Sequence, residues 1–149
     1  MSEHRVTVFW TRNASDFSYG AYSRDHTWDF GNGVKIEASA APDFLGTAEN
    51  VDPEEAYVAA LSSCHMLTFL AIAARRRLVV DSYSDSAVGY LEKNAAGKLS
   101  VTRVTLRPKV SFAEAPPPSD AELDNLHHLA HEECFIANSV HTSISVETG

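Results

Sequence analysis

Short segments rich in β-branched and aromatic residues open the chain and predict a group of strands. Residues 5–10, RVTVFW, have the composition of a strand, and so do residues 25–30 and 34–38. The last two segments flank Gly31-Asn32-Gly33, whose glycines favour a tight hairpin turn. We therefore expect an N-terminal β-meander, followed by a polar loop over residues 39–51.

The hydrophobic pattern then changes to one long apolar segment, residues 56–74. Asp52-Pro53-Glu54-Glu55 before it supplies an N-cap, a proline at N1 and an acidic residue at N3, so a helix begins here and runs to about Arg77. Polar side chains such as Cys64 and His65 make lipid a costly environment for it. We expect a core helix buried nearly all round, part of it packed against a second copy of the chain.

The remaining pattern predicts two further β segments, residues 79–92 and 98–112, joined by a turn at 94–97. A capping-box sequence, Ser119-Asp120-Ala121-Glu122, then begins a second helix over residues 120–133. That helix places apolar residues on one face, namely Leu123, Leu126 and Ala130. A final alternating strand covers residues 140–146. The order of elements predicts one α+β domain, residues 1–149, with a largely antiparallel sheet.

Charge excludes one large class of function. The chain has 149 residues and a formal net charge of −8, whereas binding to nucleic acid needs clustered basic residues. The one basic run, Arg75-Arg76-Arg77, suits the end of a helix, where cations interact favourably with the macrodipole. The N-terminus lacks the features of a secretory signal, so we expect a cytoplasmic protein that binds neither nucleic acid nor membrane.

Two cysteines, Cys64 and Cys134, lie 70 positions apart. They could form a structural disulfide, stay inert as buried thiols, or act as a redox pair. Burial in an apolar helix raises the pKa of a thiol, so a reactive Cys64 would need a cation nearby. Arg24 is a better candidate than the adjacent His65, because arginine stays charged at every working pH.

Three segments resemble the OsmC/Ohr family, the osmotically inducible and organic hydroperoxide resistance proteins. They are DPEEAYVAALSSCHMLTFL around Cys64, AHEECFIANSV around Cys134, and GAYSRDH before the second strand. The resemblance covers essentially the whole chain. It implies an OsmC-like α+β fold, in which antiparallel sheets pack around two long central helices of an intertwined homodimer.

The resemblance also implies an activity, that of a thiol-dependent peroxidase acting on organic hydroperoxides, with hydrogen peroxide as a further candidate. Cys64 would be the peroxidatic residue, Cys134 the resolving one, Arg24 the cation holding the thiolate, and Glu54 the residue that steers Arg24. No cofactor is implied beyond an external dithiol or lipoyl-type reductant. His65-Met66 departs from the aromatic residue usual after Cys64 in the hydroperoxide resistance branch.

Helix geometry constrains how these residues can meet. Glu54 and Cys64 are ten residues apart on one predicted helix, which separates them by about 15 Å along its axis. One arginine therefore cannot easily contact both within a chain. The simplest arrangement draws Glu54 from the neighbouring subunit and leaves open which subunit supplies Arg24. As an alternative role, Glu54 is a first-turn residue that interacts with the helix dipole.

Two other functions compete with the peroxidase. His127 and His131 lie at i and i+4 on one helix face and could bind a metal together with Cys134. A non-catalytic dimeric stress or binding protein with structural thiols is the second alternative. Loss of activity on chelation would favour the metal site, and slow labelling of Cys64 would favour the non-catalytic protein.

Overall fold

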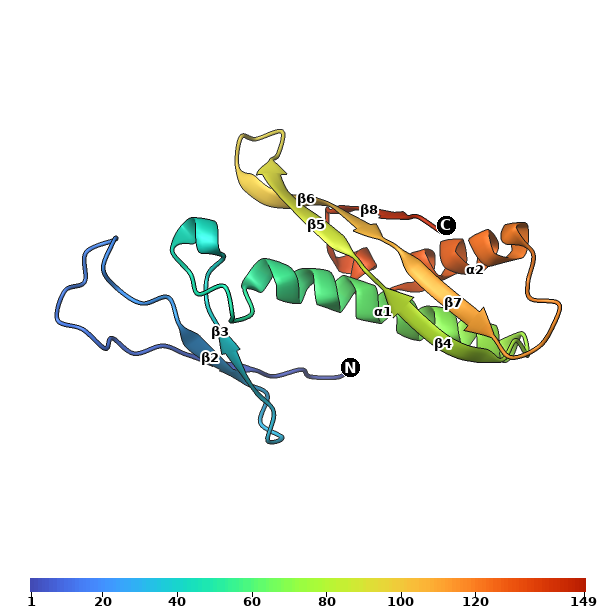
Figure 1. Cartoon of the computed structure of the whole chain (residues 1–149), viewed down its shortest axis with the longest axis horizontal. Helices are drawn as coiled ribbons and strands as arrows, with labels where there is room; N and C mark the ends of the chain where they lie inside the picture. The colour runs from blue at the N-terminus through green and yellow to red at the C-terminus, as the bar shows by residue number, and fades with distance from the viewer. The chain divides into compact units, whose positions relative to one another are not determined.

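The computed structural model describes residues 1–149 and forms two compact units, Met1–Ala56 and Tyr57–Gly149 (Figure 1). The first unit contains an antiparallel three-stranded meander of β1 (Thr7–Phe9), β2 (His26–Asp29) and β3 (Lys35–Ala38). The predicted N-terminal meander is therefore confirmed, with shorter strands than the sequence suggested.

The turn between β2 and β3 has the geometry that its glycines allow. Gly31 and Gly33 adopt φ values of 82° and 84°, a region that other residues rarely enter. The Phe30 N–H donates to the Val34 carbonyl across the turn at 3.0 Å. The hairpin depends on these two glycines.

The segment between β3 and the first long helix is more ordered than a plain loop. It contains a short 3-10 helix, η1 (Pro42–Phe44), and returns to the sheet at Val51. The Val51 N–H donates to the Glu37 carbonyl at 3.1 Å, and the Val51 carbonyl accepts from the Ser39 N–H at 2.9 Å. Residues 39–51 thus carry the chain back to β3 just before the helix begins.

The long helix α1 (Pro53–Arg75) begins where the sequence predicted. Asp52 accepts a hydrogen bond from the Glu55 N–H at 2.8 Å, and the Glu55 carboxylate accepts one from the Asp52 N–H at 3.2 Å. This reciprocal pair satisfies amides that the first turn leaves without helical partners. The helix ends at Arg75, close to the expected residue, and Arg77 follows with a left-handed φ of 62°.

The second unit holds two sheets rather than one (Figure 1). β4 (Val80–Asp85) pairs with β7 (Pro108–Phe112), while β6 (Leu99–Leu106) lies between β5 (Val88–Lys93) and β8 (Ser143–Val146). The β segments predicted at residues 79–92 and 98–112 are present, but each divides into two strands that belong to different sheets. The predicted antiparallel pairing holds except between β6 and β8, which run parallel.

Asp85 stabilises the break between the two sheets. Its carboxylate accepts hydrogen bonds from the Arg107 N–H at 2.6 Å and from the Ser62 hydroxyl at 2.5 Å. Asp85 is the last residue of β4, and Arg107 is the residue between β6 and β7. The Asp85 side chain therefore links the corner between β6 and β7 to α1. A strand pattern alone does not reveal such a corner.

The second helix, α2 (Asp120–Glu133), has the predicted bounds and the predicted capping box between Ser119 and Glu122. Leu126 and Ala130 of α2 are fully buried and pack with Phe69 and Ala73 of α1. A second cluster unites Leu61, Val104 and Leu106. The core of this unit therefore lies along α1, between α2 and the sheets.

Only one stripe of α1 is buried within the chain, formed by residues four apart: Leu61, His65, Phe69 and Ala73. The expectation that this helix is buried nearly all round is wrong for the single chain, because Leu67 on another face is 61% exposed.

On the covered side, Gly89 of β5 lies close to α1. A Cβ at Gly89 would stand 2.4 Å from Val58 Cγ2, so glycine is what allows β5 to approach the helix.

α1 is the one helix long and apolar enough to cross a membrane, with a mean hydropathy of 1.6. Length and composition are weak indicators, because the core helix of a globular domain has the same properties. Here the stripe containing Phe69 packs against α2 and the sheets, which accounts for the apolar character of that side.

Candidate active site

The fold of the second unit places Cys64 of α1 beside Cys134, which directly follows α2. The two thiols are free, and the Cys64 side chain is close enough to raise the pKa of Cys134. Their separation by 70 positions in the sequence gives no hint of this proximity. The structure therefore brings together the two predicted redox residues within one chain.

Cys134 is the more enclosed of the two thiols. It is 1% exposed and is the C-cap residue of α2, with its N–H donating to the His131 carbonyl at 3.4 Å. The Ala137 N–H points at Cys134 Sγ across 3.5 Å. Burial, followed by the neighbouring Cys64, raises the pKa of Cys134 to about 11. Near neutral pH this residue is a protonated thiol.

Cys64 is only partly buried, although the sequence around it is apolar. Its carbonyl accepts an extra hydrogen bond from Thr68 Oγ1 at 2.9 Å, one turn further along α1. Because it lies in the middle of a 23-residue helix, the backbone that carries this sulfur is well supported. The partly exposed thiol is thus the one that a small molecule can reach.

Arg24 lies in the first unit, where tyrosines hold it. Its guanidinium stands 3.6 Å from the centre of the Tyr22 ring and 4.9 Å from that of Tyr19, and it donates to the carbonyls of both residues. Glu54 belongs to the first turn of α1 and makes no ion pair within the chain. The chain by itself therefore does not form the predicted contact between Arg24 and Glu54.

His65 was the second candidate for the cation, but its surroundings exclude that role near neutral pH. Burial, and to a smaller extent the nearby His127 and His131, lower the pKa of His65 to about 4. Its ring contacts His127 of α2. His65 is consequently neutral at pH 7.

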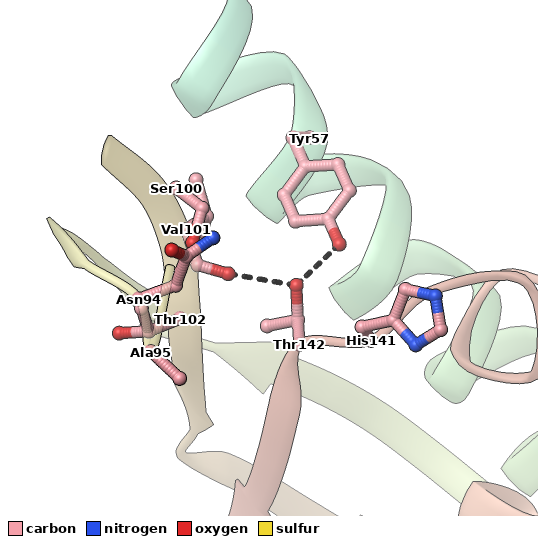
Figure 2. A pocket seen from close by; sticks show the side chains of 8 residues that line it. All are labelled: Tyr57, Asn94, Ala95, Ser100, Val101, Thr102, His141 and Thr142. Carbon is pink, nitrogen blue, oxygen red and sulfur yellow. Dashed lines mark hydrogen bonds between the residues drawn. The ribbon is translucent and has the colours of Figure 1, made fainter. Parts of the chain in front are cut away.

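An open pocket of about 590 Å³ lies between the start of α1 and the strands β6 and β8 (Figure 2). The Tyr57 and Thr142 hydroxyls meet there at 2.5 Å, and Thr142 donates to the Val101 carbonyl at 2.8 Å. Since Thr142 has one proton to give, Tyr57 is the donor to Thr142. Tyr57 precedes Cys64 by seven residues on the same side of α1, but Cys64 is not among the residues that line this pocket.

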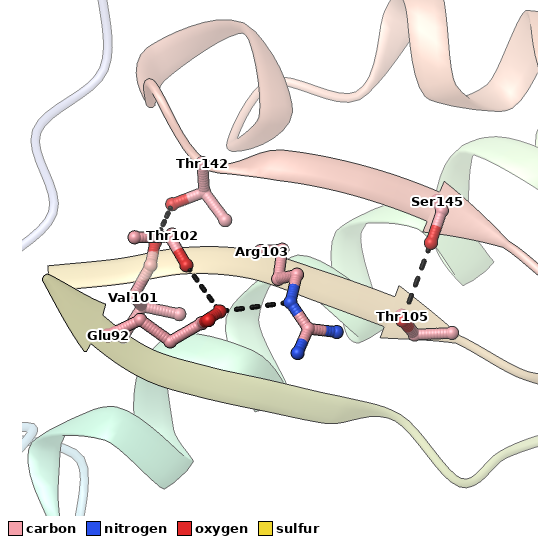
Figure 3. Close-up of polar contacts among 7 residues, drawn as sticks. All are labelled: Glu92, Val101, Thr102, Arg103, Thr105, Thr142 and Ser145. Atoms are coloured by element: carbon pink, nitrogen blue, oxygen red, sulfur yellow. Dashed lines mark hydrogen bonds and ion pairs between the residues drawn. The ribbon is translucent and has the colours of Figure 1, made fainter. Parts of the chain in front are cut away.

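Polar contacts join β5, β6 and β8 next to this pocket (Figure 3). Glu92 of β5 accepts from Thr102 Oγ1 at 2.8 Å and from Arg103 Nε at 2.9 Å. The hydrogen bond from Thr102 lowers the pKa of Glu92, and the interaction with Arg103 acts in the same direction. These contacts keep β5 and β6 in register next to Val101.

The alternative metal site receives no support from the geometry. No group of three His, Cys, Asp or Glu side chains is arranged to hold a metal ion. The buried Nδ1 of His127 bonds to His65 instead, and His128 on the exposed face pairs with Glu132 at 3.2 Å. The histidines of α2 therefore divide between the core and the surface.

The sequence profile of OsmC-like proteins matches residues 46–149, and the chain belongs to this family. A solved OsmC-like protein of unknown function from Vibrio cholerae is 55% identical over 100% of both chains, with a TM-score of 0.95. The mixed α+β fold expected for the family is thereby confirmed. Among proteins of curated function, none matches this sequence.

Two more distant structures are named for hydroperoxide resistance. The protein OhrB of Bacillus subtilis is 17% identical, covers 99% of this chain and 98% of its own, and gives a TM-score of 0.72. An organic hydroperoxide resistance protein OsmC from Legionella pneumophila is 15% identical over 99% and 96%, with a TM-score of 0.73. At these identities the likeness demonstrates a shared fold.

Proposed function

We propose that this protein is a thiol-dependent peroxidase that reduces organic hydroperoxides, with Cys64 as the attacking thiolate and Cys134 as the resolving thiol. One observation carries the proposal: two free thiols lie side by side, and they differ in exposure. Inert core cysteines need neither the proximity nor the difference. A redox pair needs both, because one sulfur must meet the peroxide and the other must meet the first sulfur.

In the first step the Cys64 thiolate attacks one oxygen of the peroxide and breaks the O–O bond. The sulfur is oxidised to a sulfenic acid, and the departing alkoxide takes a proton and leaves as an alcohol. The partly exposed position of Cys64 on a rigid helix suits this attack. Cys134 is a poor nucleophile for the same step, because its raised pKa keeps the thiol protonated.

In the second step the Cys134 sulfur attacks the sulfenic sulfur of Cys64. The S–S bond forms, the S–O bond breaks, and the thiol proton leaves with the hydroxyl group as water. An external dithiol, of which a lipoyl-type group is one example, then reduces the disulfide by exchange and is itself oxidised. The cycle needs no bound cofactor.

Arg24 is proposed as the cation that favours the Cys64 thiolate and stabilises the departing alkoxide. Its contacts with Tyr19 and Tyr22 hold the guanidinium in place without neutralising it. Glu54 is proposed to steer Arg24 from a neighbouring subunit, because about 15 Å of helix separates it from Cys64 in its own chain. The acid at the start of α1 would thus serve the other site of a dimer.

A homodimer also agrees with the exposed apolar side chains. In addition to Leu67 of α1, large apolar residues of the first unit are exposed, including Val8, Phe9, Phe17, Tyr19 and Phe30. A monomer rarely leaves so many such side chains in water, and a second copy would cover them. We propose a cytoplasmic homodimer with two sites, each completed by residues of both subunits.

The direct test is to add one equivalent of tert-butyl hydroperoxide to the reduced protein and to measure peroxide loss and intact mass. We expect one equivalent to be consumed, with a mass loss of two hydrogens and a peptide linking Cys64 to Cys134. With excess dihydrolipoamide the reaction should turn over, and hydrogen peroxide should be compared as substrate. Survival of both thiols in the presence of intact peroxide would exclude the proposal.

A further inference from the structure

We propose that the buried His65–His127 hydrogen bond is a positioning device that holds the Cys64 thiol against Cys134. This inference rests on the proposed disulfide cycle. It assigns a task to the residue that follows the attacking cysteine and to its partner on α2.

The two rings form a close contact inside the core. His65 Nε2 lies 3.0 Å from His127 Nδ1, and the ring planes are 8° apart with centroids separated by 5.3 Å. His65 is 1% exposed and His127 is 3% exposed. The His65–His127 contact is the one buried side-chain hydrogen bond that joins α1 to α2. The hydrogen bond between Arg76 and Asn125 lies on the exposed surface, beyond the end of α1.

The bond forms when only one of the two facing nitrogens carries a proton, an arrangement that two neutral rings provide. One nitrogen then donates its proton to the lone pair of the other, whereas two protonated nitrogens facing each other would repel. Burial lowers the pKa of both residues, which keeps the pair neutral at ordinary pH. The bond is therefore available throughout the range in which a peroxidase would work.

The location of the pair connects it to the sulfurs. His65 directly follows Cys64 on α1, and His127 precedes Cys134 by seven residues, which is two turns along the same side of α2. Ala130 lies between them on that side and is fully buried. In addition to their apolar contacts, α2 thus meets α1 where His127 contacts His65 and where Cys134 lies beside Cys64. The first of these two contacts fixes the rotation and register of the helices at the second.

Apolar packing alone does not supply this restraint. Phe69 of α1 and Leu126 of α2 pack in one buried cluster and stabilise the contact between the helices. Such apolar contacts have little directional preference. A hydrogen bond between two rings depends on both distance and angle. Two sulfurs already held close lose less freedom when the S–S bond forms, so the pair should make the disulfide easier to close.

A different role is available for a buried histidine pair, namely that of a polar contact that merely fills the core. His65 Nδ1 and His127 Nε2 have no hydrogen-bond partners, so the pair is not optimised for stability alone. Both roles predict that the pair affects unfolding. Only the positioning role predicts that it also affects the equilibrium between the dithiol and the disulfide.

The test measures that equilibrium without peroxide. Wild-type protein and variants are equilibrated with reduced and oxidised dithiothreitol at pH 7, and the remaining thiols are counted by alkylation and mass spectrometry. For His127→Leu we expect the disulfide to become about tenfold less favoured, which corresponds to a reduction potential higher by about 30 mV. His127→Asn keeps a hydrogen-bonding atom near the position of Nδ1 and should recover most of the loss.

His128→Leu is the matched control, because His128 is the next residue of α2 but lies on the exposed face. It should leave the equilibrium unchanged. If His127→Leu does not fold, His65→Leu removes the same hydrogen bond from the α1 side. An unchanged potential in a folded variant of lowered stability would overturn the positioning role and leave the peroxidase proposal intact. A wild-type protein that forms no disulfide at any dithiothreitol ratio would overturn both.

Discussion

Cys64 lies beside Cys134 within one chain, and the pair is asymmetric because Cys134 is fully buried while Cys64 is partly exposed. Proximity makes a disulfide possible without the movement of a whole domain. The asymmetry assigns different tasks to the two sulfurs. Substitution of each cysteine in turn therefore separates attack from resolution.

Cys64→Ser should abolish peroxide consumption, because the remaining thiol is buried and has a raised pKa. Cys134→Ser should still consume about one equivalent and should then accumulate a sulfenic acid on Cys64 that dimedone traps. Peroxide loss and dimedone labelling by mass spectrometry measure the two outcomes. Peroxide consumption by Cys64→Ser would instead assign the attack to Cys134.

Arg24→Met should preserve the fold and slow the attack on peroxide, because the charge that favours the thiolate is removed. The titration of Cys64, followed by the thiolate absorbance of Cys134→Ser protein, should move to higher pH. Arg12→Met is the control, since Arg12 is an exposed arginine of the same unit that bonds to the Ala14 and Ser15 carbonyls. An unchanged titration in Arg24→Met would remove Arg24 from the proposed site.

Gly89→Ala should destabilise the protein by about 1–3 kcal/mol, because the added methyl group meets Val58 at the crowded contact between β5 and α1. Gly20→Ala, where nothing lies within 4 Å of the added carbon, should change the stability by less than about 1 kcal/mol. Urea unfolding measures both. Equal stability of the two variants would mean that β5 can move away from the helix at little cost.

The free energy of unfolding should fall as the pH drops from about 6.5 to about 4. The pKa of His65 is about 4 in the folded protein against a usual 6.5, so the unfolded chain binds more protons in this window. The loss attributable to His65 is about 3 kcal/mol. Urea unfolding at a series of pH values measures this dependence. The free energy of unfolding of His65→Gln should change less steeply with pH than that of the wild type, whereas the exposed His128→Gln should show the wild-type dependence. A wild-type slope in His65→Gln would contradict the assignment.

The protein should sediment as a homodimer at low micromolar concentration. Leu67→Glu should shift it toward monomer, because a charge would be introduced on the uncovered face of α1. Leu99→Glu, at a similarly exposed leucine near the turn between β5 and β6, should leave the dimer unchanged. A folded wild-type monomer at that concentration would remove the homodimer from the proposal.

Local signals in the sequence predicted most of the secondary structure. The N-cap of α1 at Asp52, the capping box at Ser119 and the turn around Gly31 and Gly33 lie where the sequence indicated. Each of these features depends on residues within a few positions of one another. Short-range hydrogen bonding and backbone preference therefore suffice to predict them.

Strand pairing was less accessible because it depends on distant residues. The division of residues 79–92 between two sheets follows from the Asp85 carboxylate, which bonds to Arg107 far along the chain. The parallel pairing of β6 with β8 joins residues such as Val104 and Ile144. An alternating pattern identifies a strand, but it does not identify the neighbour of that strand.

The sequence by itself determined the family resemblance, the bounds of both helices and the two cysteines as candidates. The tertiary structure decided that these cysteines meet, that Cys134 is the buried one, and that His65 faces another histidine and is therefore neutral at pH 7. The physical reason is that helix formation depends on neighbours in sequence, whereas burial and pKa depend on the groups that packing brings together from distant parts of the chain.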